Sequence, residues 1–318
     1  MPLTTDEKLL TLSREVIEAF DKAAGGVHPG FRPGHAKGLL LTGVFTPSSD
    51  AVSLTRAPHL QRPSTPVTVR FSDFAGVPTV PDNDPQAASP RGCAIRFHLA
   101  AHVHTDIVSH SVDSFPTRTA EEFLDFLNAL LATDPAGPHP TALAQFLGAH
   151  PQALAFVQMP KPIPTSFAHE SFFAVSAFTF TNVDGVSRSG RYRVLPVAGN
   201  EYLDEAQAAA QTPNFLFDEL QERIAQEPVR FRIVVQLAAE GDRVDDATVR
   251  WPEDRPQLPF GELALTAMTP HNASEQQHII FDPIPRVDGI EASADPLFEP
   301  RANIYLMSGR RRRAAGTQ

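Results

Sequence analysis

A tyrosine and an arginine near the end of the chain stand at a spacing that could support metal chemistry. Arg301 and Tyr305 lie four residues apart and follow Pro300. Proline is favoured in the first turn of a helix, and residues at i and i+4 share one helix face, so a guanidinium can lie beside a phenol. A nearby cation favours the phenolate, which can ligate ferric iron. The alternative for the segment 296–313 is core packing with a surface ion pair.

A second group of chemically useful residues surrounds the segment PVTVRFS, 66–72. Its apolar and polar residues alternate, which is typical of a strand, and Arg70 and Ser72 fall on the polar face. A Pro/Gly turn places His35 just before an apolar strand at 39–45. An arginine that points into a barrel needs an anionic partner such as a haem propionate, and a serine could fix the orientation of an imidazole. The alternatives are a solvated sheet face for the arginine and serine, and a surface loop for the histidine.

The composition excludes several classes of protein. A net charge of −10 argues against a nucleic-acid binder, and the single cysteine, Cys93, excludes a disulfide framework or a cysteine-based zinc site. The start of the chain lacks the pattern of a signal peptide, and no stretch approaches the ~20 apolar residues of a membrane span. We therefore expect a cytoplasmic protein without a membrane span.

The elements that must position these residues are strands with helices inserted between them. Helices are predicted at 4–24, from Thr119 onward, at 141–157 and at 213–226. This order favours an α+β fold with an antiparallel sheet or barrel, and no linker divides residues 1–318 into two domains. The predicted strands are 39–45, 66–72, 93–99, 105–115, 172–182, 191–196, 231–239, 262–268 and 278–283.

Several segments together resemble the haem catalase family, specifically its short branch, the catalase-related peroxidases. The similarity extends in register over residues 30–312. The resemblance implies a single domain built on an eight-stranded antiparallel β-barrel with packed helices, with haem b between the barrel and the tyrosine helix. The segments that carry it are HAKG, TPVTVRFSDFAG, RGCAIRF, DIVSHS, WPEDRP, IIFDP, GIEAS and R-x-x-x-Y.

The resemblance also implies a role for individual residues. His35 would be the distal general acid and base, and Ser72 would hold its imidazole. Tyr305 would be the phenolate ligand of the iron, with Arg301 supporting its charge. The other residues implied to bind haem are Arg32, Arg70, Arg312 and Phe115.

Three features depart from the pattern of full catalases. His110 takes the position of a distal asparagine that helps to hold the second peroxide, so it becomes a candidate catalytic residue and catalase turnover should be weak. Phe74 takes the position of a small valine that lines the access channel. The chain also lacks the long N-terminal arm and the C-terminal domain, so we expect a homodimer rather than an arm-exchanged tetramer.

These features predict a haem peroxidase that reduces organic hydroperoxides and hydrogen peroxide with a small organic electron donor. Two alternatives stay open at this point. One is a haem isomerase or lyase that rearranges fatty-acid hydroperoxides on the same scaffold without an external donor. The other is a non-catalytic haem-binding protein, in which the distal residues would be idle.

Overall fold

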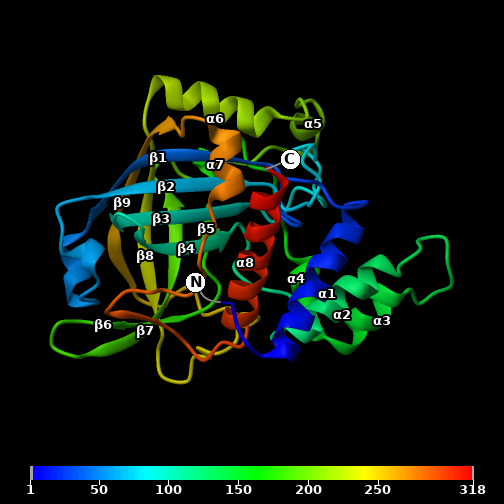
Figure 1. Cartoon of the computed structure of the whole chain (residues 1–318), viewed down its shortest axis with the longest axis horizontal. Coiled ribbons are helices and arrows are strands. Elements are labelled where there is room, and N and C mark those ends of the chain that lie inside the picture. The colour runs from blue at the N-terminus through cyan, green and yellow to red at the C-terminus, as the bar shows by residue number, and fades with distance from the viewer. Residues whose placement is uncertain (1–2, 317–318) are drawn as a thin grey trace.

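The computed structural model describes residues 3–316, and its centre is a closed antiparallel β-barrel (Figure 1). The barrel closes because its first and last strands in sheet order, β7 and β8, also pair. The predicted eight-stranded antiparallel barrel is therefore confirmed. In sheet order its strands are β7 (Ser187–Pro196), β5 (Phe172–Phe173), β4 (Val103–His110), β3 (Gly92–Ala100), β2 (Thr65–Ser72), β1 (Gly38–Pro47), β9 (Gln257–Met268) and β8 (Val229–Leu237); β6 (Phe178–Thr181) and β10 (Ile290–Ala292) extend the sheet from β7.

The helices lie outside the barrel. In Figure 1, α6 runs across the top of the barrel, and α8 stands between the barrel and the group formed by α1 to α4. Among residues 3–316, no helix has the length and apolar character needed to cross a membrane. The helices are α1 (Glu7–Ala23), α2 (Ala120–Leu131), α3 (Ala142–Ala149), α4 (Pro151–Gln158), α5 (Glu205–Ala209), α6 (Phe215–Gln226), α7 (Asn272–His278) and α8 (Phe298–Ala315).

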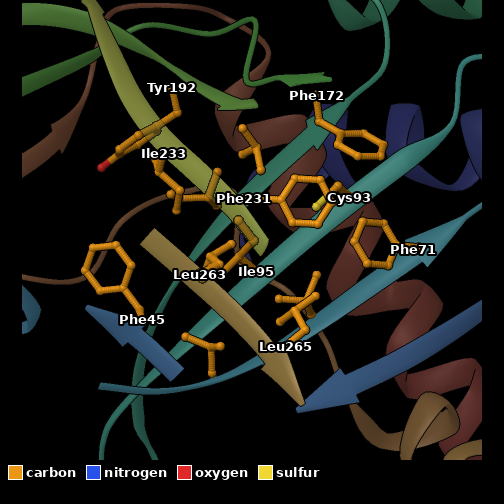
Figure 2. Packing of buried hydrophobic residues seen from close by; sticks show 14 of the residues in the cluster. Phe45, Phe71, Cys93, Ile95, Phe172, Tyr192, Phe231, Ile233, Leu263 and Leu265 are labelled. Atoms are coloured by element: carbon orange, nitrogen blue, oxygen red, sulfur yellow. The ribbon is translucent and has the colours of Figure 1, made fainter. Parts of the chain in front are cut away.

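The barrel interior is filled with aromatic and aliphatic side chains (Figure 2). The ring of Phe71 lies 5.6 Å from that of Phe172 and 5.7 Å from that of Phe231, measured between centroids. Val67 and Val69 of the same strand are buried in the same cluster. The alternation in residues 66–72 therefore identifies the inner face of β2 correctly, because side chains two apart in a strand share a face.

The outer face of β2 is also buried at its C-terminal end, at Arg70 and Ser72, which corrects both expectations for Arg70. The guanidinium points away from the barrel interior and is 4% exposed, so it neither enters the barrel nor lies in solvent. Its Nε donates to Oε1 of Gln276 on α7 at 2.9 Å, and one Nη donates to the backbone carbonyls of residues 35 and 36. Helix α7 and the segment before β1 therefore cover this face.

The first helix begins later than predicted because a different residue caps it. A capping box at Thr4 would start the helix there, but α1 starts at Glu7. The carboxylate of Asp6 accepts hydrogen bonds from the backbone N–H groups of Lys8 and Leu9, which satisfies donors that have no partner inside the helix.

Two further predicted elements differ from the structure. The helix predicted at 141–157 is two helices, because Pro151 lacks the N–H that a continuous helix needs and begins α4 instead. The segment 278–283, predicted as a strand, pairs with no strand. The backbone N–H of Asp282 donates to the carboxylate of Asp106 at 2.7 Å, so a side chain takes the place of a strand partner.

Candidate active site

The ends of three neighbouring strands bring the predicted distal residues together. Ser72 of β2 pairs with Gly92 of β3, which pairs in turn with His110 of β4. Directly paired residues of adjacent strands project from the same side of the sheet. Ser72 and His110 therefore share the outer face of the barrel that also carries Arg70.

His35 is fixed on this face by its backbone and by its ring. Its φ of 57° lies in the left-handed region, which residues other than glycine adopt rarely and which is common at functional sites. Its backbone N–H donates to the carbonyl of Phe74 at 2.6 Å. Its Nδ1 lies 3.1 Å from Oγ of Ser72. When Nδ1–H donates to this hydroxyl, Nε2 carries the lone pair that a general base needs.

Gly92 leaves the space that this pair occupies. A Cβ atom at this position would lie 2.6 Å from Oγ of Ser72 and 3.0 Å from Nδ1 of His35. Any side chain would therefore displace the serine or the imidazole. Gly92 was not among the site residues predicted from sequence, although a glycine inside a strand is a known sign of such close approach.

The surroundings keep His35 in its neutral form. Burial is the largest cause, and with the positive charge of Arg70 it lowers the pKa of His35 from 6.5 to about 3. His110 and Arg32 act in the same direction, and a hydrogen bond to the backbone of Asp73 opposes them. The imidazole is therefore uncharged at neutral pH, and one ring nitrogen keeps its lone pair.

His110, the predicted substitute for an asparagine, offers a different function from His35. Its Nδ1 accepts a hydrogen bond from the backbone N–H of Val112 at 3.3 Å, so the neutral ring carries its proton on Nε2. Burial, followed by the charge of Arg301, lowers the pKa of His110 to about 3. His110 is thus a neutral hydrogen-bond donor.

A connected set of phenylalanine rings, here called the phenylalanine wall, borders both histidines. The ring of Phe74 meets His35 edge-on at 5.5 Å, and that of Phe115 lies 6.5 Å from His110. Successive centroids along the wall are 6.1, 5.9 and 5.1 Å apart. Helices α1 and α2 each contribute one ring that was not predicted as part of the site. In order of contact the members are Phe74, Phe20, Phe123 and Phe115.

Three predicted arginines share hydrogen-bond partners next to this face. Arg32 donates to the carbonyls of Gln276 and Ile279, and Arg312 of α8 donates to the same Ile279 carbonyl at 2.8 Å. Arg70 donates to the side chain of Gln276. Among residues 3–316, none of the three forms an ion pair with a carboxylate. Gln276 was not predicted as a site residue, and no local pattern marks it.

The arginines are buried against one another. Burial is the largest cause that lowers the pKa of each, and in each case the next cause is another arginine: Arg70 for Arg32, Arg312 for Arg70, and Arg313 for Arg312. The Nε of Arg312 is buried without a hydrogen-bond partner among residues 3–316. Buried cations without ion-pair partners are costly, and an anionic group placed among these arginines would compensate their charge.

Helix α8 places Tyr305 and Arg301 one turn apart, as their spacing predicts. The centre of the guanidinium lies 5.8 Å from the centroid of the phenol ring. Tyr305 is half-buried, and no residue between 3 and 316 forms a hydrogen bond with its hydroxyl. The phenol oxygen is therefore available to a ligand.

Haem fits this set of residues. It presents two carboxylates, a flat apolar ring and an iron with an open axial position. The unpaired arginines match the carboxylates, the phenylalanine wall matches the apolar ring, and the hydroxyl of Tyr305 matches the iron. No group of three or more His, Cys, Asp or Glu among residues 3–316 could hold a metal ion by itself.

Comparison with proteins of known sequence assigns the chain to a family independently of the geometry of the site. The family model described as Catalase matches residues 26–318. A catalase-related peroxidase of Mycolicibacterium paratuberculosis is 34% identical over 297 residues, with 92% of each chain covered. Another, from Synechococcus elongatus, is 32% identical over 287 residues, with 89% of this chain and 84% of the relative covered.

Solved structures show the same architecture. A fungal catalase superposes with a TM-score of 0.78 at 22% identity, covering 98% of this chain and 64% of its own. Catalase A from Saccharomyces cerevisiae gives a TM-score of 0.77 at 21% identity, with coverage of 98% and 65%. This chain thus spans just under two thirds of either structure. The sequence matches and the closed barrel both indicate the same family, and the chain belongs to the catalase family of oxidoreductases.

Proposed function

We propose that this chain is a haem peroxidase that reduces organic hydroperoxides and hydrogen peroxide with an organic electron donor and has weak catalase activity. The observation that carries the proposal is a neutral His35, held by Ser72 and close to Arg70 and Arg32, which together with Arg312 have no acidic partners among residues 3–316. Relatives named catalase-related peroxidase support this reaction class.

The residues that would hold haem b lie on β2, on α8 and on the loop before β1. Arg32, Arg70 and Arg312 would bind the propionates through charge-assisted hydrogen bonds, and Tyr305 would ligate the iron as a phenolate stabilised by Arg301. When bound, haem supplies an iron that coordinates peroxide and takes up its two oxidising equivalents. Haem would then lie between the outer face of the barrel and α8.

The chain itself handles the proton. Nε2 of His35 would take the proton from the near oxygen of the peroxide and return it to the leaving oxygen, so that water or an alcohol departs. Ser72 prevents the imidazole from turning, which keeps Nε2 directed at the substrate. Nε2–H of His110 would donate a hydrogen bond to a peroxide oxygen without transferring the proton.

Two features favour organic substrates over rapid dismutation of hydrogen peroxide. The phenylalanine wall provides an apolar surface beside His35, against which the organic part of a hydroperoxide can pack. His110 occupies the position that the resemblance assigns to an asparagine, so the group that holds a second peroxide is changed. An organic donor would then return the enzyme to its resting state.

The test is a comparison of two kcat/KM values for the haem-loaded enzyme. One is measured for oxygen release from hydrogen peroxide and the other for oxidation of a phenolic donor driven by cumene hydroperoxide. We expect donor oxidation to be the more efficient reaction. Faster oxygen release would contradict the peroxidase proposal, and rearranged hydroperoxide products formed without a donor would favour the isomerase.

A further inference from the structure

A buried group of charged residues, here called the ion cluster, lies directly behind the distal histidine. Lys37 forms an ion pair with Asp82, and Nε of Arg91 lies 3.6 Å from Oδ1 of Asp73. The side chains of the two aspartates and of Arg91 have no solvent exposure. Such a cluster requires an explanation, because burying charges is costly unless every charge is compensated.

The ion cluster is joined to the active site through the backbone. Asp73 directly follows Ser72, and Arg91 directly precedes Gly92. A third member, Lys37, lies two positions after the distal histidine. Its backbone carbonyl accepts a hydrogen bond from the backbone N–H of Asp73 at 3.2 Å. A shift within the cluster would therefore move the residues that orient the imidazole.

Asp73 is the member whose carboxyl accepts no hydrogen bond among residues 3–316. Asp82, in contrast, accepts from Lys37 and, at 2.8 Å, from the backbone N–H of Leu216. Burial raises the pKa of Asp73 to about 8; the charge of Arg91 opposes this shift, and the neighbouring Asp82 adds to it.

The charges balance when one carboxyl keeps its proton. Glu170 also interacts with Arg91, so Lys37 and Arg91 stand beside three acids, and one retained proton makes these five groups neutral. Glu170 accepts hydrogen bonds from the backbone N–H of Ser171 at 3.0 Å and from the hydroxyl of Tyr202 at 3.1 Å. Burial raises the pKa of Glu170 to about 7, and these two bonds and the charge of Arg91 oppose that shift. Asp73 accepts no such bond among residues 3–316.

We propose that Asp73 is a positioning residue that stays protonated, donates a hydrogen bond to the carboxylate of Asp82, and so holds Ser72 in place for the distal histidine. This inference rests on the proposed function, because the positioned group is the proposed general base. Ionisation of Asp73 would set two carboxylates against each other, and Ser72 would shift away from His35. The charged groups that face Asp73 are Asp82, Lys37, Arg91 and Arg70.

Infrared spectroscopy of the haem-loaded enzyme tests the protonation directly. We expect the C=O stretch of a protonated carboxyl at pH 7 that fades as the pH rises through about 8. Asp73→Asn should lose the part of the band that fades near pH 8, and the matched control Glu170→Gln should keep that part, because the pKa of Glu170 is raised only to about 7. A wild-type enzyme without the band, or loss of the band in Glu170→Gln alone, would overturn the proposal. The wild-type and Glu170→Gln spectra decide the matter even if Asp73→Asn fails to fold.

Kinetics test the positioning role. The rate of reaction with peroxide should fall about tenfold in the wild type from pH 7 to one unit above the transition of Asp73, and should stay within about twofold in Asp73→Asn. Asp73→Ala should lose about 10- to 100-fold at pH 7, because no hydrogen bond remains. An unchanged alkaline decline in Asp73→Asn would overturn the inference. An enzyme inert to peroxide at every pH, yet with the carboxyl band, would instead refute the proposed function.

Discussion

The two faces of strands β2 to β4 differ in how they are buried. The inner face lies wholly in the barrel core, whereas the outer face is buried where β2 carries Arg70 and Ser72 and is exposed at His98 of β3. On the inner face, Val69, Ile95 and Ile107 lie in register and belong to the barrel core. On the outer face of β2, Arg70 and Ser72 are covered by other parts of the chain. Burial stabilises the inner face by about 25 cal/mol per Å² of apolar surface. On the outer face, each buried polar group must instead be compensated by its own hydrogen-bond or charge partner.

This difference shows how one barrel can carry both a core and a reactive site. Because side chains alternate along a strand, a short segment such as VRFS contributes to both faces. The outer face keeps cations without acidic partners, an arrangement that stability alone does not favour. A bound anionic cofactor would supply the missing compensation, and so the two faces should respond differently to substitution.

The largest effect should come from the inner face. Phe97 has no solvent exposure and packs edge-on against Phe45 at 5.0 Å. Phe97→Ala should lower the free energy of unfolding by about 3–5 kcal/mol, because it removes apolar contacts and leaves a cavity. Urea denaturation measures this change. A loss below about 1 kcal/mol would show that the interior is not the stabilising core.

On the outer face, His35→Ala should leave stability at pH 7 unchanged and reduce reactivity. The rate of reaction with peroxide should drop by about 10²- to 10⁴-fold, because no other group takes up the proton. Stopped-flow measurement on haem-loaded protein gives this rate. The matched control is the exposed His98, whose replacement by alanine should have no effect. Equal rates for the wild type and His35→Ala would leave haem binding intact but refute the catalytic role.

The two faces also differ in how far they could be predicted from sequence. The alternation in residues 66–72 identifies β2 and its inner face, because that pattern depends on neighbouring residues only. What covers the outer face depends on Gln276, which is 206 positions from Arg70 and belongs to a helix that was not predicted. The roles of His35 and Tyr305 came from the resemblance to a family, since each residue alone is compatible with an ordinary structural position.

A smaller effect concerns how the free energy of unfolding depends on pH, because one histidine is buried on each side of the barrel wall. Burial lowers the pKa of both His59, inside the barrel, and His35 to about 3. Between pH 6.5 and 3 the unfolded chain binds a proton that the folded chain does not, so stability is complete above pH 6.5 and falls as the pH decreases towards 3. His59→Phe should reduce this slope by up to about 1.4 kcal/mol per pH unit, with no effect on the peroxide reaction near pH 7.

Urea denaturation of the wild type and His59→Phe at pH 5 and pH 7 measures the difference. His35→Ala should reduce the slope by a similar amount, since the same burial acts on both imidazoles. The two variants would then differ in catalysis alone. Identical slopes in all three proteins would contradict the neutral state assigned to these histidines.

The absorption spectrum of the protein loaded with haem b tests the central claim most directly. If the outer face and α8 hold haem through Tyr305, the wild type should show high-spin ferric haem with a phenolate ligand and should change its spectrum on addition of peroxide. Tyr305→Phe should lose the phenolate signature and most of the bound haem, whereas Tyr202→Phe, at an exposed position, should keep both. Full haem occupancy and an unchanged spectrum in Tyr305→Phe would contradict the account.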